Sequence, residues 1–197
     1  LQENLHVEGG VGGYLQDPNS RFDINLVFVG LDNGTVASRN VMDAAERAKA
    51  VWENIIVGDV SNQVVTGGRV IDDMEITVQA GFLDLGAVDT EPTDGVDGAL
   101  ANAMTGMRRS WSDVNPFLPY TGSVGIDMAD TENTEALTVT MIHEFGHALG
   151  FSRSVLEDFG FINTQGGFVG PNALEAHQQN DALATSVPMN FDSGAHL

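Results

Sequence analysis

The sequence predicts an α/β (α+β) fold in which a twisted mixed sheet is backed by two long helices and followed by a small irregular C-terminal part. Three segments, at 22–28, 74–78 and 123–128, alternate apolar and polar residues as half-buried strands do. Two further segments, at 39–55 and 137–148, repeat apolar residues at helical spacing. The first strand, the first helix and the second strand imply a parallel strand pair joined by a right-handed crossover.

The chain begins with a polar, glycine-rich stretch at 1–20, where we expect an irregular lead-in. The strand at 22–28 ends at Gly30, and Ser38 follows as a residue that can cap the first long helix from about Arg39. Apolar residues recur along one face of that helix, so we interpret Trp52 as a core side chain.

The middle of the chain carries a glycine-containing loop with the acidic residues Asp89, Glu91, Asp94 and Asp97. Spaced oxygen ligands can wrap Ca²⁺, but this spacing matches neither an EF-hand nor a glycine-rich nonapeptide repeat. A solvated loop is the interpretation we favour, and a calcium site is the alternative. Residues 99–107 are compatible with a strand or a short helix, and we expect Arg108 and Arg109 to pair with surface acids.

The second long helix has clear start and stop signals. Its apolar stripe runs through Leu137, Met141, Phe145 and Ala148, and Gly150 is the expected stop. Candidate N-caps are Thr131, Asn133 and Thr134.

That helix contains His143, Glu144 and His147 in the pattern HExxH. Residues four apart on an α-helix return to nearly the same face, about 6 Å apart along the axis. Both imidazoles can therefore bind one ion, and Zn²⁺ accepts neutral imidazole nitrogen at about 2.0 Å. Glu144 lies beside such an ion, where it can take a proton from a water whose pKa the metal lowers toward ~7. The motif predicts a zinc site with Glu144 as general base.

The residues after the second histidine indicate the kind of zinc enzyme. The pattern HExxHxxG, from His143 to Gly150, resembles the signature of the metzincin peptidases, whose glycine lets the chain turn below the metal. Most metzincins place a third histidine where this chain has Arg153, and arginine does not deprotonate to bind zinc. Leishmanolysin-like metzincins instead have a long insertion before the third histidine.

Several segments resemble this leishmanolysin-like branch, including bacterial secreted proteins that share its catalytic core. The matching segments are 143–152, 168–176, Val187-Pro188 and Gly194-Ala195-His196. The resemblance is strongest over residues 121–196, and it nominates His196 as the third zinc ligand. It also implies that the strand at 123–128 forms the upper edge of a cleft, along which an extended peptide lies antiparallel.

Two other residues remain candidates for the third zinc ligand. His177 lies on a helix expected at 172–179, and Glu175 would give a thermolysin-like set of two histidines and a glutamate. We favour His196 over both. His6 stands alone in the polar lead-in, and we interpret it as a surface histidine.

The resemblance implies one metzincin-like zincin catalytic domain over residues 1–197, with 151–197 as its C-terminal subdomain. Metzincins carry a methionine-containing turn beyond the third histidine, whereas here Met189 precedes His196 and the chain ends at Leu197. We therefore expect a fragment whose C-terminal subdomain is incomplete.

The amino-acid composition limits the partners that the chain is expected to bind. The net charge is −20, from 28 acidic and 8 basic residues, and such a field repels nucleic acids and anionic membranes. The absence of cysteine excludes disulfides and thiolate ligands. No run approaches the roughly 18 apolar residues of a membrane span, and no signal peptide is visible. These features fit a bacterial secreted protein.

We therefore expect a secreted zinc-dependent endopeptidase that acts on protein or peptide substrates, with no nucleic-acid partner, no membrane span and an open oligomeric state. The expected zinc ligands are His143, His147 and His196. Two other classes stay open. One is a non-catalytic zinc- or calcium-binding surface or adhesion module with a degenerate peptidase core, and the other is a zinc hydrolase of another class, such as an amidase.

Overall fold

A four-stranded mixed sheet organises the computed structural model, which describes residues 21–32, 34–81, 100–128 and 131–189. The strand order is β1-β4-β6-β5. Strands β1 (Ile24–Val29), β4 (Met74–Gly81) and β6 (Thr121–Asp127) run parallel, whereas β5 (Ala101–Thr105) pairs antiparallel with β6. The mixed α/β class predicted from the sequence is confirmed.

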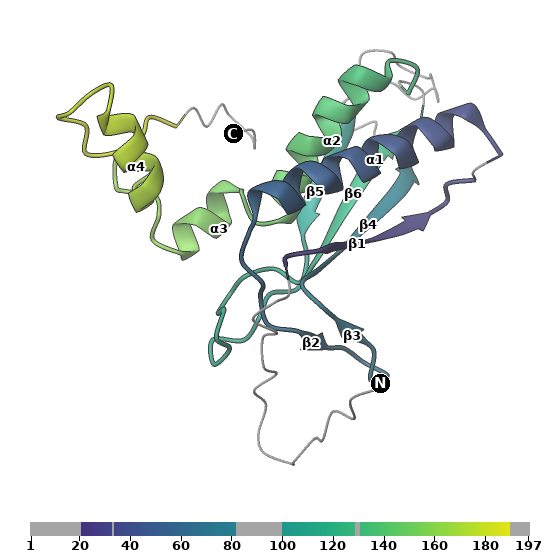
Figure 1. The fold of residues 1–197 in the computed structure, drawn as a ribbon, viewed down its shortest axis with the longest axis horizontal. Coiled ribbons are helices and arrows are strands. Elements are labelled where there is room, and N and C mark those ends of the chain that lie inside the picture. Colours follow the sequence, from purple (N-terminus) through teal and green to yellow (C-terminus); the bar gives the residue numbers. More distant parts are fainter. Residues whose placement is uncertain (1–20, 33, 82–99, 129–130, 190–197) are drawn as a thin grey trace, which may run out of the picture.

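Two long helices lie side by side over one face of this sheet (Figure 1). Helix α1 (Val36–Ile55) packs on α2 (Thr134–Ala148), and α2 also contacts β5 and β6. Removal of apolar side chains from water between helices and sheet is the main stabilising term for such a layer. The fully buried side chains there include Ile24, Val41, Ala48, Ile76, Val78, Val124, Leu137, Met141 and Phe145.

The predicted strand, helix and strand unit is confirmed in its pairing, with Ile24 opposite Met74 in a parallel register. Its helix begins earlier than expected, at Val36. The reason is the cap: the Thr35 side chain accepts a hydrogen bond from the Ser38 amide at 3.1 Å. The Ser38 hydroxyl instead accepts from the amide of Asp32.

The segment expected at the edge of the cleft lies inside the sheet. Strand β6 has β4 on one side and β5 on the other, so it presents no free edge. Among the described residues the edge strands are β1 and β5, and β5 lies within the segment that the sequence left open between strand and helix. At Gly122 in β6 a Cβ atom would come 2.8 Å from the Cβ of Ala148, so this glycine lets α2 lie close on the sheet.

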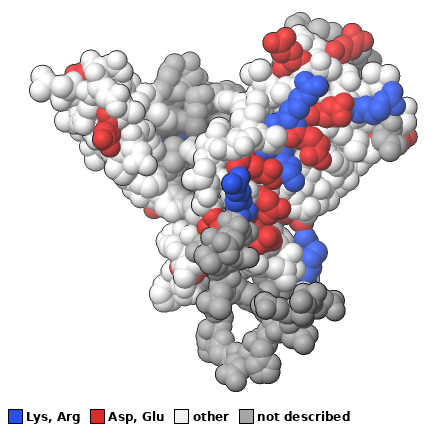
Figure 2. Space-filling view, viewed as in Figure 1, with Lys and Arg blue, Asp and Glu red and all other residues white. Residues whose placement is uncertain are grey.

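The C-terminal part lies to one side of the sheet (Figure 1). It contains α3 (Arg153–Asp158), which the sequence did not predict, and α4 (Pro171–Gln178), which it did. Phenylalanine rings connect this region: Phe161 stacks on Phe159 and lies tilted against Phe168. Figure 2 shows few charged side chains on this part of the visible face.

Two short strands, β2 (Gln63–Val64) and β3 (Val70–Ile71), form a separate antiparallel hairpin. Among the helices of the described residues, none is long and apolar enough to cross a membrane. The acidic loop at 89–98 lies outside the described residues, so the calcium alternative there stays a prediction.

The two neighbouring arginines have different environments. Arg108 pairs with Asp158 at 2.7 Å near the surface, as expected. Arg109 does not pair at the surface: it is 2% exposed, and its guanidinium donates to the carbonyls of Ser61, Pro119 and Asp73. The prediction for Arg109 was wrong because burial of the loop around it depends on contacts far away in the sequence.

Candidate active site

The two histidines of the HExxH motif converge on one point outside α2. Their Nε2 atoms lie 3.0 Å apart, and their rings meet nearly at right angles, at 86°. Two nitrogens each about 2.0 Å from a tetrahedral zinc would be ~3.3 Å apart, so the observed spacing is close to what one shared ion requires. The helical spacing therefore produces the expected pair.

The end of α2 fixes the orientation of the second histidine. Gly150 adopts a φ of +102°, and the amides of Gly150 and Phe151 bond back to the carbonyls of His147 and Gly146, as in a Schellman cap. This turn places the Phe151 carbonyl 2.9 Å from Nδ1 of His147. A carbonyl can only accept, so Nδ1 carries the proton and Nε2 keeps its lone pair for a metal.

Glu144 is 5% exposed and directly follows the first of the two histidines in α2. The same helix is held against α1 by Trp52, whose indole donates to the carbonyl of Ile142 at 2.9 Å. At Gly146 a Cβ atom would come 3.1 Å from the Trp52 ring, so the glycine allows this close approach. Trp52 also stacks on Phe151, with ring centroids 5.4 Å apart.

An apolar pocket of about 400 Å³ opens beside the histidines. Its walls come from α1, from α2 and from Phe151 in the Schellman cap. Most of the lining is hydrocarbon or aromatic, which suits an apolar group better than a charged one. The lining residues are Trp52, Val139, Ile142, His143, Gly146, His147 and Phe151.

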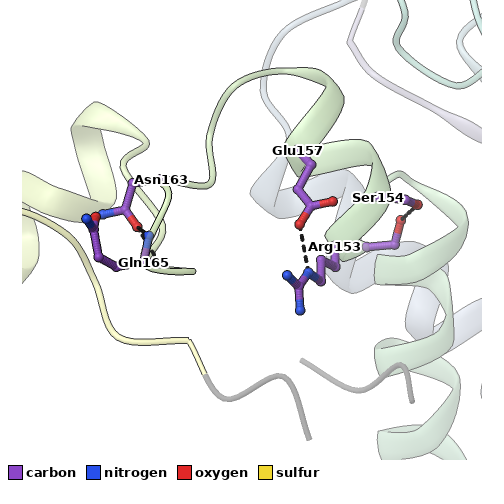
Figure 3. Close-up of polar contacts among 7 residues, drawn as sticks. Arg153, Ser154, Glu157, Asn163 and Gln165 are labelled. Atoms are coloured by element: carbon purple, nitrogen blue, oxygen red, sulfur yellow. Dashed lines mark hydrogen bonds and ion pairs between the residues drawn. The ribbon is translucent and has the colours of Figure 1, made fainter. Parts of the chain in front are cut away.

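The position where most metzincins have their third histidine is used differently here. Arg153 is the first residue of α3, and its guanidinium lies 2.7 Å from the Glu157 carboxylate one turn further on. Figure 3 shows the two side chains turned toward each other on the helix. Arg153 therefore forms an exposed ion pair within α3.

The structure leaves the third ligand as a prediction. His196 and His6 lie outside the described residues. His177 and Glu175 lie on α4, and within the described residues neither joins His143 and His147 in a group of three metal-ligating side chains. The two alternatives to His196 thus gain no support from the geometry.

The group of three that the described part of the chain does contain is acidic: Asp59, Asp72 and Asp73. The pKa of the Asp73 carboxyl is raised to about 7: burial is the largest cause, the hydrogen-bonded neighbour Asp59 also raises the pKa, and two backbone donors lower it. Those donors are the amides of Asp23 and Val60, at 2.7 and 2.9 Å. The sequence pattern did not reveal this cluster, and the adjacent pair Asp72-Asp73 before β4 was its local signal.

Comparison with models of protein families and with curated proteins finds no match for this chain.

Proposed function

We propose that the chain is the catalytic part of a zinc-dependent endopeptidase of metzincin type, leishmanolysin-like and secreted by a bacterium. The observation that carries the proposal is the convergence of the His143 and His147 Nε2 atoms, with the His147 tautomer set by the Phe151 carbonyl. The donor set fits Zn²⁺, which binds neutral imidazole and favours ligands held by such outer hydrogen bonds. His196 would complete the set.

The residues of this chain have separate roles in the proposed reaction. When bound, zinc would supply Lewis-acid chemistry, polarising the scissile carbonyl and lowering the pKa of a water. Glu144 would take the proton from that water and then pass it to the leaving amine. Its low exposure keeps bulk water away from the carboxylate, which strengthens its electrostatic interactions.

Within the part of the chain that the structure describes, no strand pairs with the outer side of β5, and this edge supports the proposal of a peptide substrate. At the two ends of the antiparallel pair of β5 and β6, the Leu100 carbonyl accepts from the Asp127 amide and the Gly106 amide donates to the Thr121 carbonyl. The backbone N–H and C=O groups of the even-numbered residues of β5 therefore point toward β6. Hydrogen-bonded positions alternate, and the backbone groups of Ala101, Ala103 and Thr105 therefore point away from β6. An extended peptide can add there as a further strand. The Thr105 hydroxyl, which donates to the His147 carbonyl at 2.9 Å, ties this edge to α2.

The test combines zinc content, measured by elemental analysis, with cleavage of casein by the full chain. One zinc per chain is expected, with weaker retention in His143→Ala, His147→Ala and His196→Ala. Glu144→Gln should keep the metal and lose cleavage by about 10²-fold or more, because only the proton transfer is removed. Zinc held as tightly in His196→Ala would move the third ligand elsewhere. A zinc-loaded chain that cleaves no protein or peptide would overturn the proposal in favour of a binding module.

A further inference from the structure

A second apolar pocket, of about 420 Å³, shares the wall residue Phe151 with the pocket beside the histidines. One of its walls is the loop of residues 114–118, and the other is formed by the end of α2 and by α3. Val155 and Leu156 contribute buried side chains from α3. The lining includes no charged side chain among the described residues, so the pocket favours an apolar occupant.

The loop wall of this pocket is fixed. Arg109 accepts from the Phe117 amide with its own carbonyl at 3.2 Å, and its guanidinium donates to the Pro119 carbonyl at 2.6 Å. The Phe117 ring packs edge-on against Phe159 with centroids 6.4 Å apart, which connects the loop to the opposite wall. A cavity whose walls are held in this way binds its ligand with a smaller loss of conformational entropy.

The pocket lies toward one end of the proposed substrate path. Thr105, the last residue of β5, bonds to the His147 carbonyl, and the pocket begins two residues after His147, at Leu149. A peptide paired antiparallel to β5 has its amino-terminal side at the Thr105 end, and antiparallel pairing is slightly more stable per residue. The residues before the scissile bond therefore approach the pocket.

We propose that this pocket binds one large apolar side chain of the substrate, on the amino-terminal side of the scissile bond. The pocket begins beyond His147, at Leu149, and an extended peptide advances about 3.3 Å per residue, so we place the selected side chain roughly two to four residues before the cleaved bond. The inference rests on the proposed endopeptidase function and adds its sequence preference.

The first experiment maps cleavage of a proteome-derived peptide library by the full chain, using mass spectrometry. Leu, Phe, Met or Trp should be enriched two to four residues before the cleaved bond. Cleavage without enrichment there would overturn the pocket inference and leave the proposed function standing.

The second experiment changes the pocket mouth. Val114 lines the pocket and is 71% exposed, so Val114→Asp should fold normally and place a charge at the entrance. For a peptide with Phe at the enriched position, kcat/KM should fall about tenfold, and a Lys peptide should gain. Trp111→Asp is the matched control, because Trp111 is on the same loop and 79% exposed but does not line the pocket. Equal effects of the two substitutions would overturn the inference.

A binding measurement separates the pocket from the chemistry. In the Glu144→Gln chain, anisotropy of a fluorescent peptide with Phe at the enriched position should report about tenfold tighter binding than the same peptide with Ser there. Adding Val114→Asp should remove the difference. Equal affinity of the Glu144→Gln chain for both peptides would overturn the pocket inference. If the protein cleaved no peptide and bound no peptide, both proposals would be overturned.

Discussion

At the scale of single residues, Arg108 and Arg109 show how strongly burial changes the contribution of a charged side chain to stability. Burial lowers the pKa of Arg109, yet its guanidinium stays paired with three backbone carbonyls. If the Arg109 guanidinium is removed, those buried carbonyls lose their hydrogen-bond donor. The resulting loss of stability is larger than the stability that a surface ion pair contributes. The difference follows from the environment, since the residue type is the same.

We therefore expect Arg109→Met to lower the free energy of unfolding by about 3 kcal/mol or more, measured by urea denaturation. Arg108→Met is the matched control, because Arg108 and Asp158 form a partly exposed pair worth roughly 0–1 kcal/mol. Similar losses in the two variants would contradict the structural role of Arg109.

Asp73 makes stability depend on pH in an unusual direction. Its pKa in the folded chain is about 7, above the ordinary value of 3.8, so the folded state holds this proton more tightly than the unfolded state. The resulting contribution to stability is complete below about pH 4 and is lost as the pH rises toward about 7. Unfolding midpoints measured across this range should report the loss.

Asp59→Asn tests that assignment. Removal of the neighbouring negative charge lowers the pKa of Asp73, so the midpoint should fall less between about pH 4 and about pH 7 than in the parent chain. Asp43→Asn, which removes an equal charge from the exposed face of α1, should leave the slope unchanged. The same slope in all three proteins would show that Asp59 does not raise the pKa of Asp73.

At the scale of elements, the Schellman cap of α2 connects helix termination to the metal site. Gly150 has a positive φ, and a Cβ atom there would lie 3.3 Å from both Pro119 and Val155. Gly150→Ala should lower the free energy of unfolding by about 1–3 kcal/mol. It should also weaken zinc binding about tenfold, because the Phe151 carbonyl moves away from His147.

Gly160→Ala is the control for that experiment. Gly160 follows α3 with a φ of +70°, and a Cβ atom there would meet nothing within 4 Å, so it shares the backbone strain without the crowding. It should lose stability and keep zinc affinity, measured by competition with a chelating dye. If both variants kept zinc equally well, the cap would have no part in orienting His147.

Local pattern predicted most of the elements. Alternation identified β1, β4 and β6, and helical spacing identified α1 and α2, because each buries one continuous apolar face. The pattern left β5 open between strand and helix, because its Ala and Met residues favour helix, and it missed α3, which lies between glycines and phenylalanines. The local pattern also could not predict the strand order, because the pairing of β5 with β6 depends on contacts between residues distant in the sequence.

The candidate site was likewise predicted only in part from the sequence. Spacing along one helix was enough to predict that His143 and His147 converge, since helix geometry fixes their separation. The Phe151 carbonyl became visible only with the turn at Gly150, and the acidic cluster only with the packing of β4 against the residues near 59. His196 lies outside the described residues, so its role stays a prediction.

At the scale of the whole molecule, the two sides of the proposed site are stabilised unequally. Helix α2 has six buried residues and lies within the main core, whereas α4 has none and α3 has two. Parts of a protein with few buried contacts open locally at a smaller free-energy cost than the core.

This inequality has a consequence for amide hydrogen exchange. The amides of α4 should exchange with deuterium through local opening, while those of α2 should wait for global unfolding and be protected longer by several orders of magnitude. Mass spectrometry of pepsin fragments after a deuterium pulse measures both, and equal protection would mean that α3 and α4 unfold together with the sheet. In the proposed peptidase, α2 would therefore be the side of the site that persists, and α3 would belong to the side that opens and reforms within the native state.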